Sequence, residues 1–248
     1  MTSTKEKFSF KSVVAELPRG EPLGVNLLAK HGVTPYRASA LARSGWLVHL
    51  ARGVYMLPGA TLTREGCLAF LNERITGFHV GSKTALDWRG VRHNVGFREV
   101  LSLWGNDRVA LPSWFTTKFP SRYQVTQLFE PHLKKNFGLQ PLPDGRSDVL
   151  VSVPERAMLE LFSDVGKNQP LEEARQLVEG LHSLRKKVLE ELLAHVTRIK
   201  VIRLAESLSQ EFDLPWADLA KHHSQRLGGG KRWVGVAKSG ERLDLRRS

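Results

Sequence analysis

Hydrophobic positions in the first sixty residues recur at helical spacing and then change to the pattern typical of strands. The helical spacing predicts three helices, and turn-forming residues end them at Pro18, Gly32 and Gly45. Two short segments rich in Val, Leu and Tyr follow, and Arg52-Gly53 separates them as a turn. The predicted helices cover 8–17, 25–30 and 35–43, and the predicted strands cover 46–50 and 54–57. This is the element order of a winged helix-turn-helix.

The rest of the chain is first mixed and then helical. Helical spacing continues over 61–90, and prolines break the following region into short elements. Predicted strands cover 100–104, 123–129 and 148–153, and predicted helices cover 154–162, 171–181, 185–195 and 199–212. We therefore expect an α+β fold. A winged helix-turn-helix over 1–60 precedes a larger mixed α/β domain over 61–248, which ends in a helical bundle.

The third predicted helix resembles the recognition helix of a DNA-binding domain. Thr34 offers a capping hydroxyl, and Pro35 suits the first helical position. Ala38, Leu41 and Ala42 share one face, which we expect to be buried. The opposite face is then available to the major groove of double-stranded DNA.

Two arginines and a basic turn are the strongest candidates for DNA contacts. An arginine side chain donates two hydrogen bonds to a guanine edge. Arg37 and Arg43 are separated by about 9 Å along the helix axis, so both can reach one groove. Arg52 lies at the predicted tip of the wing, where basic residues contact phosphate or the minor groove. The predicted DNA-binding residues are Tyr36, Arg37, Ser39, Ala40, Arg43, Arg52 and Lys30, and Lys231 and Arg232 are candidates for a second set of phosphate contacts.

Charge supports a polyanionic partner. The 248 residues have a formal net charge of +12, and residues 1–60 hold eight lysines and arginines against three glutamates. Cations of this kind release counterions from a phosphate backbone. Alternatively, the basic residues form only a solvated surface, but the predicted wing favours DNA.

Other motifs give no catalytic, metal or cofactor site. Cys67 lies in an apolar segment and is expected to be a core residue. His182 and His195 stand apart from each other, and neither HExxH nor paired-cysteine spacing occurs. Gly230-Lys231 lacks the preceding glycine and the following Ser or Thr of a phosphate-binding loop. We therefore expect a protein that is not an enzyme and needs no cofactor.

No part of the sequence predicts export or a membrane anchor. The N-terminal residues lack the apolar core of a signal peptide, and no apolar run approaches the ~20 residues that span a bilayer. We expect a cytoplasmic protein that does not bind membranes.

Five segments of the sequence resemble the AbiEi antitoxins of bacterial type IV toxin–antitoxin systems. The resemblance lies in LARSGWLVHLARGVYMLPG (41–59), GSKTAL (81–86), SVPERAMLEL (152–161), KVIRL (200–204) and LGGGKR (227–232). It implies a DNA-reading N-terminal domain and a C-terminal antitoxin domain. It further implies repression of the protein's own operon at inverted repeats. Self-association of two copies on such a repeat would tighten binding, provided that the C-terminal domains touch. The implied toxin is a nucleotidyltransferase, which the antitoxin counters without forming a stable complex.

Two other functions remain open. The first is a winged-helix transcriptional regulator unrelated to toxin control. The second is a DNA-targeted nuclease, whose Mg²⁺ would need clustered acids beside a lysine. Its candidate acids are Asp107, Glu130, Asp144 and Asp148, but no Glu-x-Lys pair follows a strand.

Overall fold

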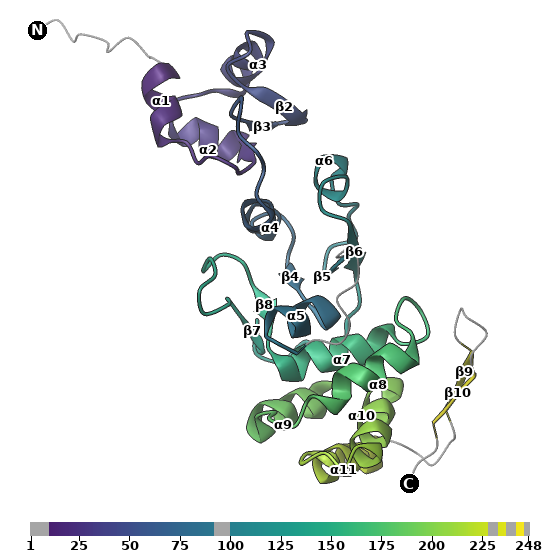
Figure 1. Ribbon diagram of the computed structural model, residues 1–248. Helices are drawn as coiled ribbons and strands as arrows, with labels where there is room; N and C mark the ends of the chain where they lie inside the picture. The colour runs from purple at the N-terminus through teal and green to yellow at the C-terminus, as the bar shows by residue number, and fades with distance from the viewer. Residues whose placement is uncertain (1–9, 92–99, 228–232, 237–241, 246–248) are drawn as a thin grey trace, which may run out of the picture. The chain divides into compact units, whose positions relative to one another are not determined.

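The structure is a computed structural model that describes residues 10–91, 100–227, 233–236 and 242–245 (Figure 1). The chain forms two compact units. The N-terminal unit comprises residues 1–74 and 110–119, and the C-terminal unit comprises residues 75–109 and 120–248.

The N-terminal unit contains the three helices and two strands predicted from the sequence. A short additional strand pairs with the hairpin, giving an antiparallel sheet in the order β1-β3-β2. The turn between the hairpin strands includes Gly53, whose positive φ of 71° suits glycine. The elements are α1 (Phe10–Glu16), β1 (Leu23–Gly24), α2 (Val25–Lys30), α3 (Pro35–Arg43), β2 (Val48–Ala51), β3 (Val54–Met56), α4 (Arg64–Asn72) and α6 (Ser113–Thr116).

A small hydrophobic core holds α1, α2, α3 and the sheet together. Val33 in the turn between α2 and α3 is fully buried, so this turn is anchored to the core. Thr34 and Pro35 begin α3 as predicted, because the Thr34 hydroxyl accepts a hydrogen bond from the Arg37 amide at 3.3 Å. The buried members of this core are Phe10, Leu17, Leu23, Leu28, Val33, Ala38, Leu47, Tyr55 and Leu57.

The N-terminal unit extends past residue 60, the boundary expected from the sequence. The Thr63 amide donates a hydrogen bond to the Gly20 carbonyl at 2.7 Å, and the Thr63 hydroxyl caps α4. Phe70 of α4 then packs edge-on against Trp114 of α6, with ring centroids 5.8 Å apart. These contacts join α4 and α6 to the preceding residues. Local hydrophobic spacing cannot predict them, because Gly20 and Thr63, like Phe70 and Trp114, are far apart in the sequence.

The C-terminal unit is built on a five-stranded mixed sheet in the order β6-β5-β4-β8-β7. Strand β4 is central, antiparallel to β5 and parallel to β8. The strands are β4 (His79–Val80), β5 (Leu101–Trp104), β6 (Ser121–Gln124), β7 (Leu139–Gln140) and β8 (Val151–Ser152), and a separate hairpin comprises β9 (Trp233–Val236) and β10 (Arg242–Leu245).

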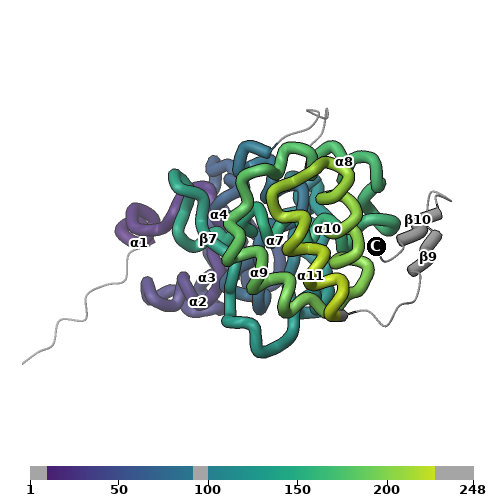
Figure 2. Tube along the Cα trace, turned by 90° about the horizontal axis from the view of Figure 1, so that it is seen from below, coloured from purple at the N-terminus to yellow at the C-terminus, as the bar shows by residue number. Residues whose placement is uncertain are grey.

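Helices form the other layers of this unit, and α7 is at their centre (Figure 2). Helix α5 lies against β5 and β8, α7 packs on α5, and α8, α9 and α10 pack on α7. Nearly every residue of α7 is buried, as expected of a helix surrounded by other elements. The helices are α5 (Ser82–Trp88), α7 (Pro154–Asp164), α8 (Leu171–Glu179), α9 (Lys186–His195), α10 (Ile199–Glu211) and α11 (Ala217–Leu227).

The predicted α+β class and the C-terminal helical bundle are confirmed, but two predicted strands are much shorter than expected. Residues 125–129 leave the sheet because the backbone of 128–130 pairs with 195–197 instead. Residues 148–150 precede β8, and the Val149 amide closes a turn onto the Arg146 carbonyl. Hydrophobic alternation did not distinguish these segments from strands.

Among the described residues, no helix combines the length and the apolar character needed to cross a membrane.

Candidate functional site

Helix α3 has one buried face and one exposed face. Ala38 is fully buried, and Leu41 and Ala42 pack against the same core, as the sequence predicted. On the outer face, Tyr36 is 79% exposed, which is unusual for a large aromatic side chain. We define the outer face of α3 as Tyr36, Arg37, Ser39, Ala40 and Arg43; all are exposed except Ala40, which is half-buried.

Hydrogen bonds hold two residues of this outer face in place. The Arg37 guanidinium donates to the Gly32 carbonyl at 3.3 Å, which ties it to the turn before α3. The Ser39 hydroxyl lies 3.1 Å from the Pro35 carbonyl and 3.3 Å from the Tyr55 hydroxyl on β3. Ser39 therefore connects α3 to the hairpin as well as facing solvent.

The hairpin and α2 present the remaining candidate contacts of the N-terminal unit, Arg52 and Lys30. Arg52 is exposed in the turn between β2 and β3, where the sequence placed it, and Lys30 is exposed in the last turn of α2. Tyr55 is buried and therefore packs rather than contacts a ligand. Trp46 packs edge-on against Phe10 but remains 43% exposed.

The two candidates for second phosphate contacts, Lys231 and Arg232, lie outside the described residues. The glycines that precede them lie outside these residues as well.

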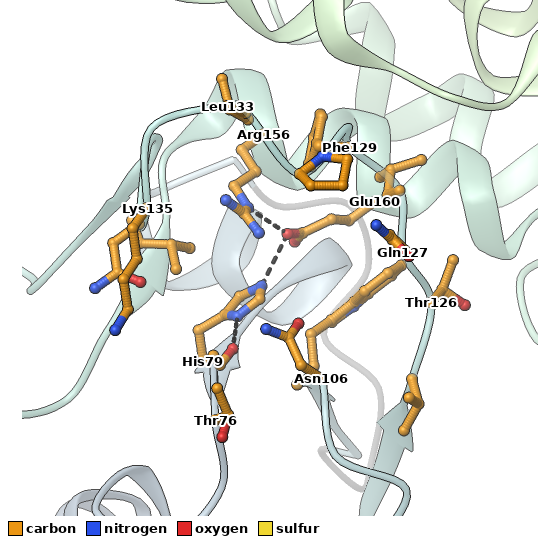
Figure 3. A pocket seen from close by; sticks show the side chains of 18 of the residues that line it. Thr76, His79, Asn106, Thr126, Gln127, Phe129, Leu133, Lys135, Arg156 and Glu160 are labelled. Carbon is orange, nitrogen blue, oxygen red and sulfur yellow. Dashed lines mark hydrogen bonds and ion pairs between the residues drawn. The ribbon is translucent and has the colours of Figure 1, made fainter.

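The C-terminal unit contains a polar cavity of about 750 Å³ (Figure 3). Its wall combines strand ends with the irregular segment that follows β6. Charged side chains on this wall are mostly basic: Arg108, Lys134, Lys135 and Arg156 against Glu130 and Glu160. Asn106, Gln127 and Asn136 add amide groups. These side chains suit a small ligand that is anionic or rich in hydrogen-bonding groups.

The Glu160 carboxylate, at the floor of the cavity, is completely buried and receives four hydrogen bonds. His79 Nε2 lies 2.9 Å from Oε1, and Arg156 Nε donates to the same oxygen at 2.8 Å. The Ser152 hydroxyl and the Ser82 amide donate to Oε2 at 2.8 and 3.0 Å. In Figure 3, His79 and Arg156 both point toward this carboxylate.

These contacts determine the ionisation of Glu160. Burial alone would raise its pKa, but the charges of His79 and Arg156 and their hydrogen bonds lower the pKa to about 2. The carboxylate is thus ionised and its oxygens are occupied by donors. It acts as a structural anchor rather than as a proton acceptor.

The backbone around Glu160 is shaped to admit the carboxylate. A Cβ at Gly81 would lie 2.3 Å from Glu160 Oε2, so only glycine leaves room. Ser82 has a positive φ of 52°, a strained value for a non-glycine residue, and its amide donates to Oε2. Two of the segments that resemble AbiEi antitoxins, 81–86 and 152–161, therefore meet at one carboxylate.

Both ends of α7 are also tied to distant residues. Glu155 in the first turn is buried; burial would raise its pKa, but hydrogen bonds from the Arg185 side chain and amide lower it. At the other end, Lys200 Nζ donates to the Ser163 and Val165 carbonyls at 2.8 Å. Burial and the nearby charges of Lys167 and Arg198 lower the pKa of Lys200 to about 8. The segment 200–204 thus caps the same helix.

The structure also locates residues weighed from the sequence for other chemistry. Burial raises the pKa of Cys67 to about 12, in agreement with a core residue. Asp107 accepts a hydrogen bond from the Thr76 amide, and Asp148 pairs with Arg146. Within the described part of the chain, the four acids considered for a nuclease do not form a cluster of metal ligands.

Sequence reasoning missed one cluster. The fold brings Glu130 and His132 next to His195, although local spacing gave no reason to group them. Only the long-range pairing of 128–130 with 195–197 could have indicated it.

Comparisons with known proteins identify the family. Residues 98–245 match the family described as "Transcriptional regulator, AbiEi antitoxin, Type IV TA system". Residues 6–97 match its N-terminal domain, described as "Transcriptional regulator, AbiEi antitoxin N-terminal domain". The chain belongs to this family. The AbiEi resemblance noted in the sequence is therefore confirmed, and the anchor at Glu160 lies in the matched region of an AbiEi protein.

A solved structure shares the fold of this AbiEi chain. The crystal structure of the RV2827C protein from Mycobacterium tuberculosis matches with a TM-score of 0.56 at 13% sequence identity. The match covers 91% of this chain and 86% of that chain. No match was found among curated proteins.

Glu160→Gln is expected to destabilise the C-terminal unit by about 3 kcal/mol at pH 7, because it breaks a buried ion pair. The carboxyl pKa falls from 4.5 to about 2 on folding, so its stabilising effect is complete above pH 4.5 and lost as the pH falls toward 2. Denaturant unfolding of the wild-type protein and of Glu160→Gln at several pH values measures this difference in the free energy of unfolding. Glu179→Gln, an exposed control, should change little. An unchanged free energy of unfolding in Glu160→Gln would refute the anchor.

Asp164→Asn is expected to stabilise the protein at neutral and alkaline pH. Burial, followed by the charge of Glu160, raises the pKa of Asp164 from 3.8 to about 6, so the folded state resists its ionisation. This cost develops as the pH rises from 3.8 and is complete above 6. At pH 8 the gain should be about 2–3 kcal/mol, and below pH 3.8 it should vanish. Thermal unfolding across this pH range tests it, with exposed Asp144→Asn as the control.

Proposed function

We propose that this AbiEi-family protein is a DNA-binding repressor of its own operon, and that the N-terminal unit reads the operator as a winged helix-turn-helix. The observation that carries the proposal is the outer face of α3, where Tyr36 is 79% exposed beside Arg37 and Arg43. A groove-reading helix presents side chains of this kind, exposed and able to donate hydrogen bonds to base edges.

The charge distribution supports this face as the one that approaches DNA. Residues 22–63 include α2, α3 and the hairpin, and they contain no aspartate or glutamate. The same residues carry Lys30, Arg37, Arg43 and Arg52. A phosphate backbone would therefore meet no repulsive side chain from this segment.

The contacts divide into two roles. Arg37 and Arg43 contact base edges in the major groove, and Tyr36 covers the adjacent sugar or base surface. Arg52 at the hairpin turn and Lys30 contact phosphates, which position the helix but do not specify sequence. Two copies on an inverted repeat would bind more tightly than one and would block access of RNA polymerase to the promoter.

The second part of the proposal concerns the toxin. The family description names an antitoxin of a type IV system, and the partner that we propose is a nucleotidyltransferase toxin encoded beside this gene. The C-terminal unit counters this toxin without a stable complex. Alternatively, the protein is a regulator that does not affect a toxin, and the experiments below distinguish the two.

The double variant Arg37→Ala/Arg43→Ala is expected to lose operator preference. Each lost base contact costs about 1–3 kcal/mol, so the affinity for upstream DNA should fall by at least roughly tenfold. Binding to labelled upstream and scrambled DNA over a salt series measures this. For the wild-type protein, the logarithm of the association constant should fall linearly with the logarithm of the salt concentration, with a slope of about −0.9 for each phosphate contact.

The control for this experiment is Lys186→Ala/Lys187→Ala, which removes two exposed positive charges from the C-terminal unit. It should retain preference for the upstream DNA. Equal losses in the two double variants would mean that net charge, rather than the outer face of α3, governs binding, and would overturn the proposal.

The antitoxin function is tested by coexpressing the neighbouring nucleotidyltransferase from an independent promoter and measuring growth. Wild-type protein and Arg37→Ala/Arg43→Ala should both restore growth, because neutralisation resides in the C-terminal unit. Glu160→Gln should fail to restore growth, because the C-terminal unit is destabilised. Copurification should detect no stable complex of the toxin with any of these proteins. Failure of the wild-type protein to restore growth would favour a regulator without toxin control.

A further inference from the structure

A backbone pairing brings two distant segments of the C-terminal unit into contact. The Glu130 amide donates to the His195 carbonyl at 2.9 Å, and the Thr197 amide donates to the Leu128 carbonyl at 3.0 Å. Phe129 and Val196 form the antiparallel bridge between them. Since this pairing is made by the main chain, Glu130 and the C-terminal end of α9 are held side by side.

Three potential metal ligands gather at this pairing. Glu130, His132 and His195 each offer one ligand atom, and these atoms all lie within 4.8 Å of one another. His132 Nε2 is 2.9 Å from a Glu130 oxygen, and the two imidazole rings have centroids 4.9 Å apart. Two imidazoles and one carboxylate form a set of ligands that zinc uses in proteins when a further position is left to water.

The orientation of His195 suits a metal ligand. Its Nδ1 lies 2.8 Å from the Glu191 carbonyl oxygen, and because a carbonyl can only accept, Nδ1 carries the proton. In the neutral imidazole, the lone pair is then on Nε2. A ligating histidine typically has such a hydrogen bond from its second nitrogen, which fixes the tautomer and the ring plane.

The three side chains differ in how far they are exposed to solvent. The His195 side chain is only 16% exposed at the end of α9, whereas those of Glu130 and His132 are 41% and 71% exposed. His195 is therefore the ligand held in place, by its burial and its hydrogen bond to Glu191, whereas the more exposed Glu130 and His132 side chains have room to adjust around an ion. Glu130 also lines the polar cavity, so a bound ion would lie at the rim of that cavity.

We propose that Glu130, His132 and His195 bind one divalent transition-metal ion, and that the ion is Zn²⁺. The nitrogen ligands favour zinc over magnesium, which prefers oxygen ligands and keeps its water. The ion would join the loop that carries His132 to α9. This site is separate from the outer face of α3 and does not depend on the proposed DNA binding.

The test is a metal titration of the full chain without a polyhistidine tag. Co²⁺ is added first because its visible absorption reports nitrogen coordination, and Zn²⁺ then displaces it. We expect one ion per chain. His195→Gln should weaken the affinity for the metal by about 100-fold or more, because removing a ligand costs at least as much affinity as removing the hydrogen-bond partner of a ligand. His182→Gln, an exposed histidine outside the cluster, should bind like the wild type.

Glu130→Gln provides a second variant, because its partly exposed side chain can change without altering the backbone pairing. It should also weaken binding, and circular dichroism should show that both variants fold. Retention of full Zn²⁺ affinity by folded His195→Gln and Glu130→Gln, or equal loss in His182→Gln, would overturn the site. Absence of stoichiometric binding by the wild type would overturn it as well.

Discussion

The C-terminal unit depends on the burial of one ionised carboxylate. Glu160 lies on a helix that is covered on all sides, and it receives donors from β4, α5, β8 and its own helix. A buried charge is tolerated only when its oxygens are satisfied. Gly81 leaves room for the carboxylate, and Ser82 beside it accepts a strained backbone, so four elements meet at a single side chain.

The N-terminal unit was largely predictable because its information is local. Periodicity, the Thr34 cap and the turn glycines locate α2 and α3 within neighbouring residues. The buried Ala38 and the exposed Arg37 and Arg43 follow from helical spacing alone. The hydrophobic pattern did not predict β1. This strand has only two residues, which pair with β3, and two residues are too few to show a hydrophobic period.

The C-terminal unit was less predictable because distant residues determine it. The pattern of 123–129 resembles a strand, yet the backbone there pairs with the end of α9. In the sequence, Glu155 and Glu160 flank an apolar run, and nothing near Glu160 indicates His79 as its partner. The grouping of Glu130 with His195 has the same origin. In each case the partner lies too far along the chain for spacing to show it.

If α3 reads the operator as proposed, the hydrogen bond between Ser39 and Tyr55 has a consequence for how operator preference can diverge among relatives. Position 39 joins the helix to the hairpin, so a replacement there changes the scaffold as well as the surface. Positions 36 and 43 have no such hydrogen bond to the hairpin among the contacts of the described residues, and Tyr36 is 79% exposed. New operator preferences should therefore arise by substitution at positions 36 and 43, while a small hydroxyl residue persists at position 39.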